Sequence, residues 1–308
     1  MTQSAPGESR LALGAGIGCY LLWGVVPLVF QAMGHLGISS WEILASRTVW
    51  AVPMALVFVL AARQGAEVLA VLRNRRTMAW LALSAMLIAA NWSIYIWAVN
   101  SGRVLETSLG YYINPLLAMA AGALMFGERI DRLGAVAITL AGLGVVVQAV
   151  AIGGLPLVSL ALAFSFGGYG IVRKRVAASA QAGLFIECLL LVGPGLAYVL
   201  WLQHAGVGHF GAGWPATTWI LACGPITAVP LVLFSWAARR IPLSTLGFLQ
   251  FIGPTIAFVI GVLQGEAFTP LRAASFAFIW GGAAVFAFAA WRRSRPELRA
   301  TALVEPAE

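Results

Sequence analysis

The segment SLGYYINP at residues 108–115 recurs in outline later in the chain, as TLGF at 245–248 and IGP at 252–254. When Pro115 is aligned with Pro254, the offset of 139 residues also pairs Gly122 with Gly261. Each copy then ends in Gly-Glu, at 127–128 and at 265–266, with one residue of slippage. This shared order of motifs indicates an internal repeat.

Long apolar segments surround both copies. A membrane-spanning helix needs about twenty apolar residues, and ten segments reach roughly that length: 11–31, 41–62, 78–99, 104–126, 132–150, 155–172, 182–203, 216–238, 243–264 and 272–292. The aligned prolines lie in the fourth and the ninth, so the repeat is five helices long. An odd number inverts the second copy in the membrane, as in many secondary transporters with a substrate site near the midplane.

The predicted fold is therefore an all-α integral membrane protein with ten transmembrane helices in two inverted five-helix repeats. The first repeat is expected at 11–150 and the second at 155–292, followed by a cytoplasmic tail at 293–308. Sixteen of the 19 basic residues lie before the first segment, after the last, or in alternate gaps. Because basic residues concentrate in cytoplasmic loops, both termini are expected in the cytoplasm.

Composition excludes several classes of protein. A chain that is 61% hydrophobic and 10% charged is not a soluble globule. The net charge of +8 belongs to loops on one membrane face, so it predicts contact with anionic lipid and no binding of nucleic acid. The three cysteines lie in predicted spans and the three histidines in solvated outer loops, which predicts no metal site and no cofactor.

Small residues and prolines mark the two aligned helices. Gly122 and Gly261 belong to faces of small residues that let helices approach closely, which fits plain packing as well as a moving contact between repeats. Pro115 and Pro254 each remove a backbone donor and disfavour the preceding helical turn. Freed backbone groups at membrane depth must face protein or a wet cavity, and Asn114 and Gln250 supply polar side chains beside those breaks.

Ionisable residues inside spans are the default functional candidates. Ser39 and Glu42 form a capping-box pattern at the start of the second segment, yet Glu42 is also a candidate for coupling transport to protons. Arg47 lies deeper, and three interpretations stay open: its head reaches the outer interface, it pairs with Glu42 or Glu106, or it faces a cavity and holds an anionic substrate. Glu187 is expected at the position in the seventh segment that Glu42 has in the second, as a second coupling carboxylate.

Aromatic side chains gather near polar ones in the second, third and fourth segments. An aromatic wall with a few placed polar groups is typical of a small-molecule pocket, although ordinary helix packing gives the same pattern. The candidate substrate pathway contains Arg47, Trp50, Asn91, Trp92, Tyr95, Tyr111, Asn114 and Gln250.

The chain resembles the RarD-type proteins of the drug/metabolite transporter superfamily, which carry a pair of EamA-like domains. The resemblance rests on AANW (89–92), IWAVN (96–100), LETSLGY (105–111), INPL (113–116), GER (127–129), LAFSF (162–166), VRK (172–174), LSTLGF (243–248), IGPT (252–255) and FAFIW (276–280). It implies a ten-helix permease of the bacterial inner membrane. The family offers no settled catalytic residues to carry over.

The predicted function is a secondary transporter that exports small metabolites or drug-like solutes by alternating access. The chain has no Gly-rich phosphate loop with Lys-Ser/Thr, so ATP is not expected as the energy source. The expected partners are the solute and membrane lipid, with protons as the candidate coupling ion, and a homodimer is left open. The alternatives are an integral membrane enzyme acting on lipids, which lacks a recognisable catalytic cluster here, and a scaffold that moves no solute.

Overall fold

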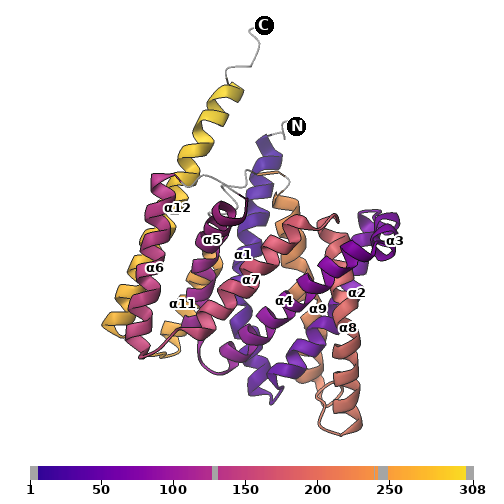
Figure 1. The fold of residues 1–308 in the computed structure, drawn as a ribbon. Coiled ribbons are helices and arrows are strands. Elements are labelled where there is room, and N and C mark those ends of the chain that lie inside the picture. Colours follow the sequence, from indigo (N-terminus) through magenta and orange to yellow (C-terminus); the bar gives the residue numbers. More distant parts are fainter. Residues whose placement is uncertain (1–5, 127–130, 239, 242–248, 303–308) are drawn as a thin grey trace.

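The protein is described by a computed structural model over residues 6–126, 131–238, 240–241 and 249–302. Within these ranges every regular element is a helix (Figure 1). The helices are α1 (Pro6–His35), α2 (Ser40–Ala61), α3 (Gly65–Arg73), α4 (Arg75–Asn100), α5 (Val104–Phe126), α6 (Arg132–Ile152), α7 (Leu157–Arg175), α8 (Ala180–His204), α9 (Trp214–Ala238), α11 (Ile252–Leu263) and α12 (Pro270–Ala302). The all-α prediction is confirmed.

Seven of the described helices are long and apolar enough to cross a membrane. These seven candidate spans lie in α1, α2, α4, α6, α8, α9 and α12, while α7 and α11 contain shorter apolar helices. The outer surface agrees with this assignment, because large apolar side chains such as Leu60, Val146 and Leu200 are more than half exposed. Polar side chains such as Ser84, Thr107 and Ser159 are fully buried instead, so the apolar surface faces outward, as lipid requires.

Two expectations about the helices need correction. The segment 243–264 was expected as one span, but α11 begins only at Ile252 because Gln250 and Phe251 form a turn. Pro254 accounts for the interruption, since it cannot donate to the carbonyl of Gln250. The structure also has α3, a nine-residue helix between α2 and α4, which the apolar pattern did not predict. Residues 243–248 lie outside the described part of the chain.

Polar caps define where several helices begin. Ser39, Asn74, Asp131 and Ser179 each accept a hydrogen bond from the backbone N–H three residues later, at the starts of α2, α4, α6 and α8. Such side chains satisfy donors that a helix start leaves unpaired. The start of α1 and the end of α12 lie on one face of the bundle, called here the terminal face (Figure 1). The α1–α2, α4–α5 and α8–α9 connections lie on the opposite face.

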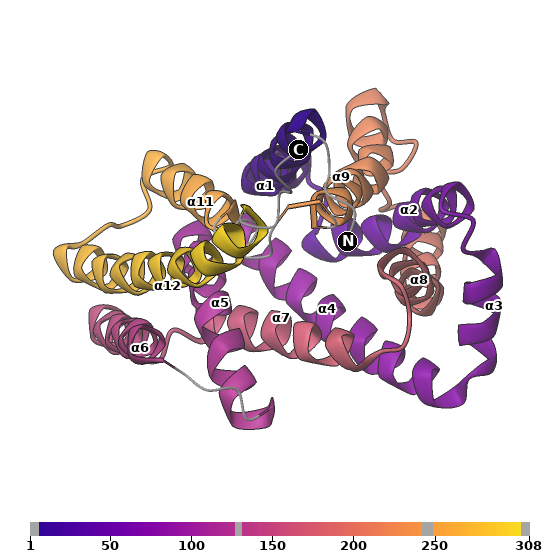
Figure 2. The same ribbon diagram turned by 90° about the horizontal axis from the view of Figure 1, so that it is seen from above.

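In the view from above, α4 and α7 cross the middle of the bundle, with α6 and α12 as a pair at one edge and α2, α3 and α8 toward the other (Figure 2). Glycines allow the closest approaches. A Cβ on Gly144 of α6 would lie 3.0 Å from the carbonyl oxygen of Ser275 and would clash with Ile279, both on α12. In return, a Cβ on Gly282 of α12 would lie 2.8 Å from the carbonyl oxygen of Ala137 and 3.4 Å from the nitrogen of Ala141, both on α6.

Candidate functional site

Arg47 is buried inside the bundle. It lies in α2, eight residues after the cap Ser39, with 8% of its surface accessible. Its Nε donates to Oγ1 of Thr227 on α9 at 2.8 Å. Its guanidinium carbon lies 4.1 Å from the ring centroid of Trp92 on α4. A guanidinium over an indole face is held by cation–π attraction, so three helices position this cation.

The structure excludes two of the three interpretations of Arg47. Its burial rules out a side chain that reaches the outer interface. Neither acid proposed as its partner is available, because Glu42 binds His209 and Glu106 pairs with Arg103 at 2.8 Å. The contacts to Thr227 and Trp92 place Arg47 in the interior of the bundle, and the third interpretation, a cavity-facing arginine that holds an anionic substrate, stays a prediction.

Aromatic rings extend from Arg47 into the bundle. Phe30, Tyr95, Tyr111, Phe166 and Tyr169, from α1, α4, α5 and α7, form a continuous series in which neighbouring ring centroids lie 5.6 to 6.2 Å apart. We call these five residues the aromatic wall. The Arg47 guanidinium lies 5.7 Å from the Phe30 ring at one end, and the Tyr169 hydroxyl lies 3.4 Å from Glu187 at the other.

Asn91 fixes the middle of the aromatic wall. Its Oδ1 accepts from the Tyr111 hydroxyl at 3.0 Å, while its Nδ2 donates to the carbonyl of Leu162 at 3.1 Å and to Oγ of Ser165 at 3.0 Å. Buried amides need such partners. The structure therefore brings five of the predicted pathway residues together: Arg47, Asn91, Trp92, Tyr95 and Tyr111.

Glu187 of α8 is the second buried charge. It accepts from the Ser84 hydroxyl at 2.5 Å, and its Oε1 lies 3.6 Å from Nη1 of Arg173. Glu187 lies eight residues after the cap Ser179, as Arg47 lies eight residues after the cap Ser39. When the caps are used for alignment, Glu187 has the position in α8 that Arg47 has in α2, so the expected equivalence of Glu187 with Glu42 is wrong.

Glu42 is a structural link as well as a cap residue. Its backbone N–H donates to Oγ of Ser39 at 3.2 Å, which is one half of the expected capping box. Its carboxylate turns elsewhere and accepts from the backbone nitrogen of His209 at 2.8 Å, with the ring Nδ1 of His209 also at 2.8 Å. The expectation that His209 is simply solvated is wrong, because this histidine ties the α8–α9 connection to α2.

The other predicted site residues have further neighbours, although Trp50 also packs against the hydrophobic cluster that contains Phe30 and Tyr95. Trp50 packs its ring 5.9 Å from Phe210 in the α8–α9 connection. Asn114 is buried, and neither side-chain polar atom has a partner among the described residues. Gln250 lies in the turn before α11. The side chains of Pro115 and Gly122 fall outside the described part of the chain, although the α5 backbone is helical through both.

The aligned proline and glycine of α11 face other helices. The carbonyl of Pro254 accepts from the Ser108 hydroxyl at 2.7 Å, and Thr255 shares a 2.5 Å hydrogen bond with Tyr112. A Cβ on Gly261 would lie 3.0 Å from the Leu105 side chain. Both copies of the repeated motif therefore contact each other, along α5 and α11.

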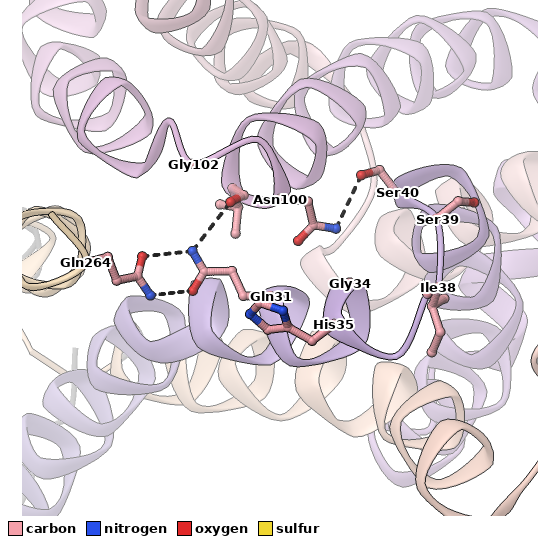
Figure 3. A pocket seen from close by; sticks show the side chains of 11 residues that line it. Gln31, Gly34, His35, Ile38, Ser39, Ser40, Asn100, Gly102 and Gln264 are labelled. Atoms are coloured by element: carbon pink, nitrogen blue, oxygen red, sulfur yellow. Dashed lines mark hydrogen bonds between the residues drawn. The ribbon is translucent and has the colours of Figure 1, made fainter. Parts of the chain in front are cut away.

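A cavity of about 610 Å³ (Figure 3) lies beside the α1–α2 connection, on the face opposite the termini (Figure 1). Gln31 of α1 and Gln264 after α11 join their amides there by two reciprocal hydrogen bonds of 2.9 and 2.7 Å. Asn100 donates to Oγ of Ser40 on the other side of the cavity at 3.3 Å. Most of the polar side chains that line the cavity are amides and hydroxyls, and His35 adds a titratable ring.

Glu266 closes the same face between α11 and α5. Its carboxylate accepts from the backbone nitrogens of Val104 and Leu105 at the start of α5. A carboxylate at a helix N-terminus also interacts favourably with the helix dipole. Burial raises the pKa of Glu266, while the two backbone hydrogen bonds and Arg272 act in the opposite direction.

Sequence reasoning missed several of these residues. Thr227, Phe30 and Phe166 touch the site from helices whose lateral positions no apolar pattern reveals. Glu266 was noticed only as the end of a repeated motif, although an acid just past a broken helix is a sign of a link to another helix end. Among the described residues, no three His, Cys, Asp or Glu side chains are grouped to hold a metal ion.

Comparison with known proteins identifies the class. Residues 10–149 match the EamA-like transporter family. The chain is 42% identical over 303 residues to "Protein RarD" of Streptomyces exfoliatus, covering 97% of this chain and 96% of that protein. It is 39% identical over 281 residues to an "Uncharacterized transporter" of Vibrio cholerae, covering 91% and 92%. "Protein RarD" of Escherichia coli K12 is 38% identical over 281 residues, covering 91% and 94%.

These relatives and the apolar helical bundle define a multi-pass membrane transporter. The chain belongs to the RarD-type group of the EamA-like transporter family, as its sequence motifs predicted. A solved crystal structure with 20% sequence identity also matches, with a TM-score of 0.58 over 91% of this chain and 98% of that one. At that identity the match supports the fold alone.

Proposed function

We propose that the protein is a secondary transporter that exports small metabolites or drug-like solutes by alternating access. In this proposal, ten spans form two inverted five-helix units at 11–150 and 155–292, and both termini are cytoplasmic. The substrate pathway passes Arg47 and the aromatic wall between the units. The observation that carries the proposal is the reciprocal contact between α6 and α12.

Reciprocal contacts are the signature of a two-fold axis, in which residue i contacts j and the equivalent of j contacts the equivalent of i. Adding 138 to Gly144, Ala137 and Ala141 gives Gly282, Ser275 and Ile279, which are the partners described above. Position rises along α6 as it falls along α12, so the helices are antiparallel. An axis in the membrane plane relates inverted repeats in this way.

Two further observations support the same axis. The caps Ser39 and Ser179 begin α2 and α8, which pack against each other, with Gly195 of α8 facing Ala45 and Thr48 of α2. The family match also ends at residue 149, at the end of the first proposed unit.

Alternating access requires links between the units that break on one face at a time. On the face opposite the termini, three such links join the proposed units: Gln31–Gln264, Glu42–His209 and Glu266 with the start of α5. Near the terminal face, Gln64 donates to Gln181 at 3.2 Å and Glu67 accepts from the Ser179 backbone at 2.6 Å. Both sets of links are formed in this structure. Rocking of one unit against the other would break one set while the other set stays formed.

The driving force in this proposal is an ion or solute gradient, with protons as the candidate ion. Glu187 is the better-placed of the two coupling candidates, because it is buried beside the hydroxyls of Ser84 and Tyr169. Protonation of a buried carboxylate changes its pairing with a cation such as Arg173. Glu42 is bound by His209 of the α8–α9 connection. In this proposal that contact would break when the face opposite the termini opens.

The proposal is tested with purified protein in sealed vesicles without ATP. Vesicles loaded with one unlabelled metabolite at a time should accumulate the same labelled metabolite by counterflow for at least one member of a broad panel. Vesicles with a protein locked by a Gln31→Cys, Gln264→Cys cross-link serve as the matched control and should not. If no solute exchanges above protein-free vesicles although the protein is folded, the transporter mechanism proposed here is wrong.

A further inference from the structure

Arg47 has a positive charge that no acidic side chain in the described residues neutralises. Its only side-chain hydrogen bond goes from Nε to the hydroxyl of Thr227. That hydroxyl donates its own proton to the carbonyl of Cys223 at 2.8 Å, so its lone pair is available to Arg47. Both Nη groups, with up to four N–H donors, have no acceptor among the described residues.

A buried arginine in this position costs desolvation free energy unless an acceptor or an anion binds its guanidinium group. Guanidinium groups stay protonated in proteins, and ionisable side chains inside a membrane protein pair with each other or mark the path of a substrate. The acids that form ion pairs in the described structure are engaged elsewhere: Glu106 with Arg103, Glu187 with Arg173 and Glu42 with His209. The described part of the chain therefore supplies no anionic partner for Arg47.

We propose that Arg47 binds the carboxylate of an organic anion whose planar apolar body lies against Trp92 and the aromatic wall. This proposal rests on the function proposed above and names its substrate class. A guanidinium fork matches a carboxylate through two parallel hydrogen bonds, and Thr227 and Trp92 leave the two Nη groups for that purpose. Trp92, Tyr111 and Phe166 are only partly buried, so their rings have surface left for a ligand.

The same arrangement selects against an ammonium group on the ligand. Arg47 itself repels a cation, and the acid at the far end of the aromatic wall is already paired, because Glu187 has Arg173, Ser84 and Tyr169 as neighbours. Buried charges without a partner carry a large desolvation cost. The site is therefore built for a carboxylate without a nearby positive charge.

Three small probes of similar shape test this directly. Benzoate, benzamide and benzylamine present an anion, a neutral amide and a cation on the same ring. Titration of the detergent-purified protein by calorimetry at pH 7.5 should show benzoate binding at least about tenfold tighter than benzamide, since one hydrogen-bonded charge contributes that much or more. Benzylamine should bind weakest. Equal affinity of benzoate and benzamide would overturn the assignment.

Variants locate the charge that is responsible. Arg47→Gln should reduce the benzoate preference over benzamide to about onefold, and Arg47→Lys should keep part of it because it keeps the charge. Arg63→Gln is the matched control, since it removes the same charge from the exposed α2–α3 turn and should bind benzoate like the wild type. If Arg47→Gln does not fold, Arg47→Lys and Thr227→Val decide: both should weaken benzoate more than benzamide, and an unchanged ratio in both overturns the proposal.

Counterflow separates this inference from the proposed function. If benzoate binds through Arg47 but no solute is exchanged in vesicles, the transport mechanism fails and the anion site stands. If a neutral or cationic solute is exchanged and benzoate neither binds nor competes, the transporter stands and the anion site is wrong.

Discussion

Glu42 at the start of α2 binds His209 at two points, through the backbone nitrogen and the ring Nδ1, both at 2.8 Å. The carboxylate is buried while the histidine is partly exposed. A buried acceptor with two partners orders the segment that supplies them. The α8–α9 connection is thereby attached to α2 through Glu42, which lies 167 residues before His209 in the sequence.

Replacement of Glu42 by Gln should loosen this connection. The amide can accept only one of the two bonds well, so we expect faster hydrogen–deuterium exchange over residues 205–213 and a loss of about 1–3 kcal/mol in stability. His209→Ala should give a similar loss, and the double variant should be no worse than either single one. His204→Ala, at the exposed end of α8, is the control. Additive losses would contradict direct pairing.

The α6–α12 contact predicts different outcomes for two glycines of one helix. A methyl group on Gly144 would clash with Ile279, whereas a methyl group on Gly142 meets nothing within 4 Å. Gly144→Ala should therefore lower the melting temperature, at a cost of about 1–3 kcal/mol. Gly142→Ala should leave it unchanged or raise it, because alanine favours helix. Thermal unfolding in detergent measures both, and equal melting temperatures would contradict the close approach.

Cross-linking tests whether α1 and the end of α11 separate during transport. In a background without the native cysteines, Gln31→Cys with Gln264→Cys should react with a short bifunctional maleimide, since the native amides touch. The cross-linked protein should lose counterflow, and each single variant treated in the same way should keep it. Full activity after complete cross-linking would show that this pair does not need to part.

Acid should weaken the Glu266 link at a higher pH than expected for an ordinary glutamate. The ionised carboxylate is the acceptor for Val104 and Leu105, and burial raises the pKa of Glu266. The link is therefore complete above this raised pKa and is lost as the pH falls through it. A cysteine in place of Leu105 should gain reactivity toward a water-soluble maleimide over that range, measured relative to an exposed reference cysteine because only the thiolate reacts. In Glu266→Gln this relative reactivity should be high and independent of pH.

Removal of the Glu187 charge tests coupling. Glu187→Gln keeps the shape of the side chain and the hydrogen bond from Ser84, but it cannot exchange a proton. We expect solute counterflow to persist while accumulation driven by a pH gradient is lost. Ser84→Ala, which keeps the carboxylate, should retain the gradient response. A pH-driven flux that survives in Glu187→Gln would remove this residue from the coupling role.

Much of the fold follows from the sequence because lipid imposes simple rules on helix length. The apolar segments match the described helices closely, and caps such as Ser39 mark their starts. The association of Asn91, Tyr95 and Tyr111 was also predictable, since polar and aromatic residues share helices there. The partners of Arg47 and Glu42 were not predictable, because Thr227 and His209 lie far along the chain and local patterns do not encode which helices become neighbours.

Pro254 predicted a weakened helical turn but not the late start of α11 at Ile252, and α3 was not predicted at all. A short helix of nine residues with only Val68 and Val71 buried has too weak a pattern to separate from a polar loop. The position of Glu187 within α8 was also not predictable from the apolar pattern, because it depends on where Ser179 caps the helix.

The helices α5 and α11 are joined at three heights, by Glu266 at one end, by Gly261 against Leu105, and by Ser108 and Tyr112 against Pro254 and Thr255. Two helices that contact each other along their length cannot slide past one another without breaking all of these contacts at once. In the motion proposed above, these two helices therefore tilt apart from the end that Glu266 joins, and the contacts of Ser108 and Tyr112 with Pro254 and Thr255 form the pivot.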